Sequence, residues 1–480
     1  MQSFRTSALA RTLQGACRTP SHTAVKRYSS RTAAASLLQQ STRLQQSHSL
    51  PSPQSRQLPT SFTQPRRNAS SSSSPSEPLQ KTPLYDLHLA HGAKMVPFGG
   101  FHMPVQYASL SVSQSHLFTR SHASVFDVSH MVQRLFSGPG AARFLERITP
   151  SGVASLGEHR STLSCIMKED GTGGIVDDTI ITRLGDGTFY VVTNAACREK
   201  DNAYLEREMR KWNEGEGKDG LEVREERWDG RGLVALQGPE AEVILKGVLA
   251  DEGLELRKLL FGQSAYARVK MAGGELSSPV LISRGGYTGE DGFEISIPGE
   301  ETVGVTEALL AAGPEKVQLA GLGARDSLRL EAGMCLYGHD LDESTTPAEA
   351  ALSWIIPKER RTKDAGFYGA DVIASQLVAK SKGGSGVERR RVGLIVEGAP
   401  AREGAEIVSR AAEGTESVIL GKVTSGCPSP SLGKNIAMGY VKDGFHKAGT
   451  EVDVLVRGRP RKAVVAKMPF VPTKYWKGEA

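Results

Sequence analysis

The chain has 480 residues and a formal net charge of +6. The positive charge lies at the N-terminus, because residues 1–78 hold ten Lys or Arg against one acidic residue, Glu77. Subtracting this +9 (ten minus one) from +6 leaves −3 for residues 79–480, which excludes a basic, nucleic-acid-binding body. No stretch is long and apolar enough to predict a membrane span.

Residues 1–78 have the composition of an organellar transit peptide. They are rich in Ser, Gln and Arg, nearly free of acids, and end in the run Ser70–Ser74. Such a composition favours mitochondrial import, although it also permits a merely disordered tail. We therefore predict a disordered mitochondrial transit peptide over 1–78, without fixing the cleavage point.

The remaining 400 or so residues are enough for two or three domains. Their four cysteines are widely spread and form no C-x-x-C pair: Cys165, Cys197, Cys335 and Cys427. This spacing argues against a zinc ribbon, an iron–sulfur site or a disulfide framework. Cys197 has no histidine nearby in sequence, so a small buried thiol is its favoured role.

A β-hairpin with two carboxylates at its open end is predicted over residues 173–194. Asp177-Asp178 precedes a strand rich in β-branched residues, Asp186-Gly187 supplies a two-residue turn, and a second strand ends at Asn194. This register pairs Thr179 with Asn194 and brings Asp178 beside them. Carboxylates in such apolar surroundings are candidates for proton transfer or for holding a cationic substrate, while a solvated strand end is the alternative.

The periodicity of the rest predicts an α+β body followed by a small β domain. Helices are expected at 140–148, 198–212, 240–249 and 323–330, and strands at 232–236 and 292–297. A polar, Gly-rich linker is expected at 381–390, after a body over 79–380. Six short strands then predict an antiparallel barrel or sandwich over 391–480, at 391–396, 406–408, 417–423, 436–441, 451–456 and 463–467.

Two further segments combine charge with apolar surroundings. The Gly-rich run 284–294 lacks the Lys-Ser/Thr of a P-loop and ends at Glu294, which could pair with an amino-heterocyclic edge or with a structural arginine. In the run 321–340, we expect a charge ladder that joins domains to include Asp326, Arg329 and Glu331. Arg325 is the charge expected to face a polar or anionic ligand.

A series of ordered motifs resembles one family closely. The motifs are Thr82-Pro83-Leu84-Tyr85, 126–131 (FDVSHM), 173–178 (GGIVDD), 286–292 (GYTGEDG), 323–329 (GARDSLR), 423–430 (VTSGCPSP) and 468–472 (MPFVP). Together they resemble the T-protein family of the glycine cleavage system, the mitochondrial aminomethyltransferases, from about residue 81 to 476. The resemblance implies a folate-binding body of three subdomains arranged as a cloverleaf, two of them interleaved in 79–380, with a C-terminal β-barrel.

The resemblance also implies an activity and its site. The family transfers the methylene carbon of the aminomethyl-lipoyl H-protein to tetrahydrofolate in the mitochondrial matrix, giving 5,10-methylenetetrahydrofolate and ammonia. Lipoylated H-protein and the P- and L-proteins are the implied partners of a monomer, with neither nucleic acid nor membrane, and no metal, flavin or nicotinamide is implied. Asp178 takes the place of the catalytic acid, and the implied folate-binding residues are Met131, Val192, Asn194, Glu294, Arg325 and Tyr475.

Some assignments and two other functions stay open. Arg325 could contact the pterin or the glutamyl tail, either Tyr475 or Trp476 could pack on the ligand, and the cluster 358–361 (KERR) is a candidate H-protein surface. Flavoprotein demethylases carry a similar folate module together with a dinucleotide-binding half, which a G-x-G-x-x-G motif usually marks. This chain has no such half. A non-catalytic folate-binding protein that assists iron–sulfur assembly is the second alternative, and the presence of Asp178 counts against it.

Overall fold

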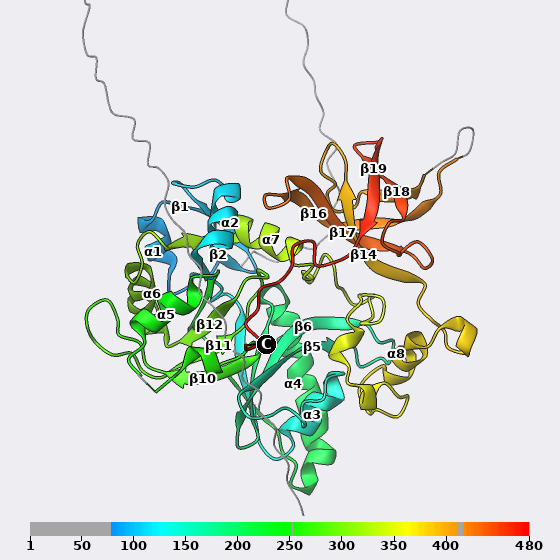
Figure 1. Cartoon of the computed structure of the whole chain (residues 1–480). Helices are drawn as coiled ribbons and strands as arrows, with labels where there is room; N and C mark the ends of the chain where they lie inside the picture. Colours follow the sequence, from blue (N-terminus) through cyan, green and yellow to red (C-terminus); the bar gives the residue numbers. More distant parts are fainter. Residues whose placement is uncertain (1–77, 252, 411–415, 480) are drawn as a thin grey trace, which may run out of the picture. The chain divides into compact units, whose positions relative to one another are not determined.

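The computed structural model describes residues 78–251, 253–410 and 416–479. The predicted transit peptide therefore lies outside the described residues, apart from Pro78. Two architectures follow one another along the chain, a mixed helix and strand body and a closed β-barrel (Figure 1). The predicted fold class, α+β with a C-terminal antiparallel barrel, is confirmed. In the part of the chain that the structure describes, no helix is long and apolar enough to cross a membrane.

The body is built on one large sheet and a small ribbon. The ribbon pairs β1 (Ala93–Phe98) with β2 (Phe101–Tyr107). The large sheet is antiparallel except for the parallel pair β13 and β3. Its strands, in spatial order, are β13 (Val317–Ala320), β3 (Ala123–Asp127), β9 (Gly232–Gln237), β12 (Gly292–Ile297), β11 (Val280–Arg284), β10 (Gln263–Ala267), β5 (Arg160–Met167), β6 (Ile175–Gly185), β7 (Thr188–Thr193), β4 (Val132–Ser137) and β8 (Arg224–Arg227).

Helices cover this sheet where its strands present apolar side chains. The helices are α1 (Tyr85–Ala90), α2 (Val112–Ser121), α3 (Ala141–Ile148), α4 (Arg198–Glu214), α5 (Ala241–Val248), α6 (Thr302–Ala311), α7 (Leu322–Glu331) and α8 (Ala370–Leu377). The predicted helices agree with α3, α4, α5 and α7 to within two residues at either end. Figure 1 shows α5 and α6 beside β10, β11 and β12, and α3 and α4 beside β5 and β6.

Alternate residues of single strands pack in different cores. On β9, Val234 and Leu236 join the core under α5 and α6, whereas Leu233 and Ala235 face another cluster. On β7, the odd-numbered residues 189 and 191 join the core under α3 and α4, whereas Tyr190 and Val192 face that same other cluster. Because side chains alternate across a strand, the sheet must curl so that its two halves share an inner face. That inner face positions the candidate site.

The C-terminal barrel closes from six antiparallel strands. In order around the barrel they are β14 (Arg389–Val396), β17 (Lys434–Lys442), β16 (Ile419–Ser429), β15 (Glu406–Ser409), β18 (Glu451–Val456) and β19 (Arg459–Ala466). All six predicted strands are present, and β14 begins at Arg389, inside the segment expected to be a linker. Closure removes exposed strand edges and encloses a core of its own.

Buried charged residues of α7 form hydrogen bonds to the barrel. Arg329 donates to Asp340 Oδ2 at 2.6 Å and to the barrel residue Ser425 Oγ at 2.9 Å. Glu331 accepts from Ser429 at the end of β16 at 2.5 Å. The expected charge ladder over Asp326, Arg329 and Glu331 is therefore confirmed, with Asp326 on its exposed side, 2.9 Å from Arg329.

Candidate active site

The predicted hairpin forms, but its register differs by one residue from the expectation. Asp186 and Gly187 both have positive φ, +46° and +69°, as a tight two-residue turn requires. A bulge between Arg183 and Gly185 then shifts the pairing, so that Thr179 pairs with Thr193 and not with Asn194. The expected pairing of Thr179 with Asn194 was wrong because a sequence pattern does not reveal a bulge. The shifted register brings Asp178 opposite Asn194.

Asn194 joins the two carboxylates of the hairpin. Its Nδ2 donates to Asp178 Oδ1 at 2.8 Å and to Asp177 Oδ1 at 2.9 Å. Its backbone N–H donates to Asp177 Oδ2 at 2.8 Å. Burial, followed by the charge of Asp177, raises the pKa of Asp178 to about 7. A carboxyl group with this pKa can hold or release a proton at neutral pH, which suits acid–base chemistry.

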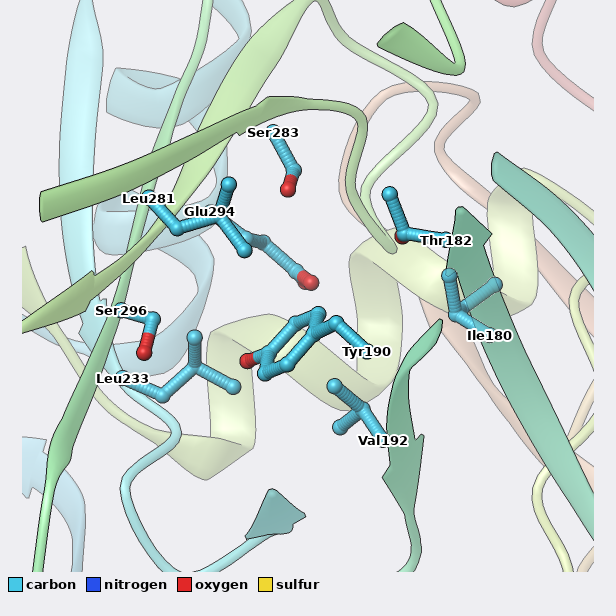
Figure 2. Close-up of a pocket in the computed structure, with 9 residues that line it drawn as sticks. All are labelled: Ile180, Thr182, Tyr190, Val192, Leu233, Leu281, Ser283, Glu294 and Ser296. Atoms are coloured by element: carbon cyan, nitrogen blue, oxygen red, sulfur yellow. The ribbon is translucent and has the colours of Figure 1, made fainter. Parts of the chain in front are cut away.

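A pocket lies between the two halves of the curled sheet (Figure 2). Two residues of the predicted site, Val192 on β7 and Glu294 on β12, line it, and the remaining lining residues are Ile180, Thr182, Tyr190, Leu233, Leu281, Ser283 and Ser296. Figure 2 shows Glu294 and Tyr190 both reaching into this pocket. Ile180 and Thr182 are two and four residues beyond Asp178 on β6. Asp178 therefore projects from the same face of its strand as the pocket lining.

Glu294 and Arg325 are electrostatic partners without a direct ion pair. Burial raises the pKa of Glu294, and the charge of Arg325 opposes this rise. Burial likewise lowers the pKa of Arg325, against the charge of Glu294. No ion pair within 4.0 Å includes either residue in the described ranges, and the Arg325 Nη1 is buried without a hydrogen-bond partner there. The structural Glu–Arg pair considered for Glu294 is thus not formed.

Tyr287 connects the Arg325 side of the site to Asp178. The guanidinium of Arg325 lies over the Tyr287 ring, 4.8 Å from its centroid. The Tyr287 hydroxyl donates to the carbonyl of Cys335. Burial raises the pKa of this hydroxyl, to which the charge of Asp178 also contributes. Asp178 and Arg325 therefore act on the same phenol from different elements, β6 and α7.

The other two predicted residues, Met131 and Tyr475, do not line the pocket between the two halves of the sheet. Met131 packs at the edge of the inner cluster and lines a separate surface groove with residues such as Arg198 and Trp228. Tyr475 stacks on Phe261, with ring centroids 4.2 Å apart, and its hydroxyl is buried with no hydrogen-bond partner among the described residues.

The neighbouring ring, Trp476, lies against charged groups. Its Nε1 donates to Arg257 O at 2.9 Å and its backbone N–H to Asp291 Oδ1 at 3.2 Å. The Arg257 guanidinium lies 4.5 Å from its ring centroid. These contacts occupy Trp476, so Tyr475 is the better candidate for a ligand-facing ring.

Three residues near the site were not selected from the sequence as functional residues. Tyr190 lines the pocket, Tyr287 lies under Arg325, and Asp201 at the start of α4 lies beside Asp177. Tyr287 stands inside the Gly-rich motif, which was a usable signal. The spacing of Asn194, Cys197 and Asp201, three and then four residues, was a second one, since it places all three on one side of a helical turn.

One group of residues in the described ranges has atoms close enough to share a metal ion. Ligand atoms of Asp177, Cys197 and Asp201 lie within 4.8 Å of one another, and all three residues are buried. The described cysteines are all free thiols. Burial, followed by the charges of Asp177 and Asp201, raises the pKa of Cys197, so its thiol is a poor source of thiolate.

Comparisons with known proteins agree with this architecture and chemistry. Residues 84–360 match the family model of the GCVT N-terminal domain, and residues 389–472 match that of the glycine cleavage T-protein C-terminal barrel domain. The chain belongs to the glycine cleavage T-protein family, the aminomethyltransferases. The predicted family, activity class and fold are thereby confirmed.

Individual relatives match over nearly their whole length. A probable mitochondrial aminomethyltransferase of Schizosaccharomyces pombe is 49% identical over 85% of this chain and 97% of its own length. The mitochondrial aminomethyltransferase of Homo sapiens is 48% identical over 83% and 92%, respectively. The crystal structure of glycine cleavage system aminomethyltransferase T from Bartonella henselae matches with a TM-score of 0.70 at 40% identity, over 83% and 99%. The mitochondrial relatives indicate that this chain too is mitochondrial.

Proposed function

We propose that the chain transfers the methylene carbon of an aminomethyl-lipoyl group, carried by the H-protein, to tetrahydrofolate. The C–N bond to the leaving ammonia and the C–S bond to the lipoyl arm break, and two bonds form from the carbon to N5 and N10 of the folate. The products are 5,10-methylenetetrahydrofolate, ammonia and dihydrolipoyl H-protein. The observation that carries the proposal is the position of the Asp178 carboxyl group, which accepts a hydrogen bond from Asn194 on the pocket-lining face of the curled sheet.

Asp178 acts on the positive charge that develops at the transferred carbon. Loss of ammonia from the sulfur-bound carbon gives thionium character, whereas cleavage of the C–S bond from the nitrogen-bound carbon gives iminium character. A nearby carboxylate stabilises either cation. Asn194 fixes the orientation of that carboxylate through the 2.8 Å hydrogen bond. Because the pKa of Asp178 is about 7, the group can also accept a proton from the attacking nitrogen.

Glu294 and Arg325 bind the folate. Glu294 can accept two parallel hydrogen bonds from the amino-pyrimidinone edge of a pterin, and these would compensate for its burial. Arg325 has a buried, unpartnered Nη1 in the described part of the chain and faces a carbonyl or carboxylate of the ligand. Val192 and Met131 supply apolar contacts, and Tyr475 closes the site from the C-terminal segment. The reaction takes place in the mitochondrial matrix, where the P- and L-proteins complete the system.

Part of the basic cluster 358–361, the candidate H-protein surface, binds the chain's own backbone. Arg360 donates to the carbonyls of Glu146 at 2.6 Å and Pro150 at 3.1 Å, and Arg361 donates to Ile356 O at 2.8 Å. These guanidinium groups therefore hold the chain's own backbone together. Lys358 is exposed and stays a candidate contact.

The test is the Asp178→Asn variant in two assays. We expect ammonia release from aminomethylated H-protein to fall by about 100-fold or more, as when one preorganised electrostatic group is removed. Folate affinity should change by less than about threefold, because the amide still accepts the Asn194 hydrogen bond. Asp186→Asn, at the exposed tip of the same hairpin, is the matched control and should retain full activity.

The same assays separate the proposal from the non-catalytic alternative. A chain that binds tetrahydrofolate but releases no ammonia from aminomethylated H-protein above the uncatalysed rate would be a folate-binding module. Retained turnover in Asp178→Asn would remove Asp178 from the mechanism while leaving the reaction itself intact.

A further inference from the structure

Two carboxyl groups lie buried side by side next to Asp178. Asp177 on β6 and Asp201 in the first turn of α4 are both 0% exposed. An oxygen of each lies within 4.8 Å of the other and of the Cys197 thiol. Two ionised carboxylates this close in an apolar interior repel each other strongly. One of the two charges must therefore be neutralised, by a proton or by a cation.

Hydrogen bonds decide which carboxyl group is ionised. Each oxygen of Asp177 accepts an N–H from Asn194, at 2.8 Å from the backbone and 2.9 Å from Nδ2. Neither oxygen of Asp201 has a donor among the described residues. A carboxylate needs donors, whereas a protonated carboxyl group can itself donate. Asp177 is thus the ionised member and Asp201 the protonated one.

A proton fits this environment better than a cation does. The three-residue group contains no histidine, and its thiol has a raised pKa because it is buried beside acids. Each oxygen of Asp177 accepts one hydrogen bond from Asn194 and keeps a second lone pair that can accept a hydrogen bond. A proton on Asp201 needs no further ligands, since Asp177 accepts it at once.

We propose that Asp201 is a neutral carboxyl group that donates a hydrogen bond to Asp177, and that this shared proton positions Asn194 and Asp178 for aminomethyl transfer. The positioning part rests on the proposed function of Asp178. Burial, followed by the charge of Asp177, raises the pKa of Asp201 to about 9, which agrees with a proton held at neutral pH. Asp201 is a positioning residue, because it acts on Asp178 only through Asp177 and Asn194.

The order of contacts explains how a buried proton affects the reaction site. Asn194 Nδ2 uses its two hydrogens on Asp177 Oδ1 and Asp178 Oδ1. If Asp201 lost its proton, its negative charge would repel Asp177 and make the electrostatic potential at Asp178 more negative. The amide bridge would then lose one of its two fixed ends. The shared proton therefore leaves the Asp177–Asp201 pair with one negative charge instead of two.

The direct test is infrared difference spectroscopy of the full chain at pH 7.5. We expect a protonated carboxyl band in the parent chain that is absent in Asp201→Asn. Absence of a band specific to Asp201, or one equivalent of a divalent metal in the purified protein by atomic emission, would overturn the proposal. This measurement requires no turnover. A chain that shows the band but no aminomethyl transfer would keep the shared proton and reject the function proposed for the site.

The kinetic test compares three variants on α4. Asp201→Ala removes the donor and should lower kcat by about tenfold or more with little change in the folate KM, as expected for a displaced catalytic group. Asp201→Asn can still donate to Asp177 and should restore kcat to within about threefold of the parent. Glu206→Gln, exposed on the same helix, is the matched control. Equal losses in Asp201→Ala and Asp201→Asn would contradict the proposal.

A pH profile supplies a readout that a merely structural role would not change. In the parent, kcat should decline as Asp201 ionises near pH 9, whereas Asp201→Asn should show no such decline. The other charged or titratable groups that face Asp201 are unchanged in this comparison: Asp177, Arg134, Lys200, Cys197 and Tyr337. An alkaline decline that persists in Asp201→Asn would assign it to one of these groups.

Discussion

Replacing Glu331 by alanine should break one buried polar connection between the barrel and the body. Glu331 is 0% exposed and lies at the end of α7. Its carboxylate accepts from His116 at 3.1 Å, from Arg120 Nη2 at 2.8 Å and from the barrel residue Ser429 at 2.5 Å. Ser431 adds donors at 2.7 and 3.1 Å. The variant would leave all of these donors without this acceptor.

The magnitude of the loss follows from the pKa of Glu331. Burial alone would raise this pKa, but the hydrogen bonds and charge of His116, together with Ser429 and Ser431, outweigh it and lower the pKa to about 2. Compared with an ordinary glutamate, the difference corresponds to roughly 3 kcal/mol of folding free energy, at about 1.4 kcal/mol per pKa unit. Breaking a buried ion pair by removing one partner costs about 3–5 kcal/mol, which agrees.

Urea unfolding at pH 7 is the assay, with Glu206→Ala as control. We expect Glu331→Ala to lose about 3 kcal/mol of unfolding free energy. The variant of the exposed Glu206, which pairs with Arg210, should lose less than about 0.5 kcal/mol. The Glu331 contribution is present above the unfolded-state pKa and is lost as pH falls through 4 towards 2. The difference between parent and variant should therefore shrink in acid. A loss below about 1 kcal/mol at pH 7 would refute this account of the interface.

Three further outcomes are expected at the site. Arg325→Ala should weaken tetrahydrofolate binding by about tenfold or more in calorimetric titration, since it removes a buried guanidinium. An unchanged dissociation constant would exclude Arg325 from the site. Glu294→Gln should also weaken folate binding. It should not lower the free energy of unfolding, because it replaces a carboxyl group whose pKa is raised by burial, and whose charged form burial therefore disfavours, with a neutral amide. For the parent, kcat should fall as pH drops through about 7, where Asp178 gains a proton. Asp178→Asn should lack this acid limb, and a limb that persists would belong to another group.

Much of the architecture could be predicted because it depends on local patterns. The Asp-Gly turn, the 292–297 strand and the 451–456 strand follow from turn chemistry and β-branched runs, and the structure has both strands at those bounds. The charge ladder on α7 followed from a general rule, since charges in an apolar segment must be paired. These features need no knowledge of distant contacts.

The rest could not be predicted because it depends on long-range packing. The bulge at Leu184 changes the register by one residue, and nothing in the local sequence marks it. The curled sheet brings β6 and β7 opposite β9, β11 and β12, which are at least 39 positions further along the chain than Thr193. For Asp201, the spacing to Asn194 and Cys197 was a local signal, but the role of Asp201 could not be read from it. Its importance comes from Asp177, which the fold alone brings beside it.

Burial disfavours the charged forms of three ionisable groups at this site. Burial raises the pKa of Glu294 and Asp178 and lowers the pKa of Arg325, so the folded chain holds three groups whose charged forms lack full solvation or pairing. A bound pterin would supply the missing hydrogen-bond partners to Glu294 and Arg325, and a developing cation would supply the missing charge to Asp178. The free-energy cost of burying these groups is incurred when the chain folds. They therefore need little reorganisation when substrate binds. The same reasoning explains why Asp201 must stay neutral, since a second buried anion would raise that cost without contacting the ligand.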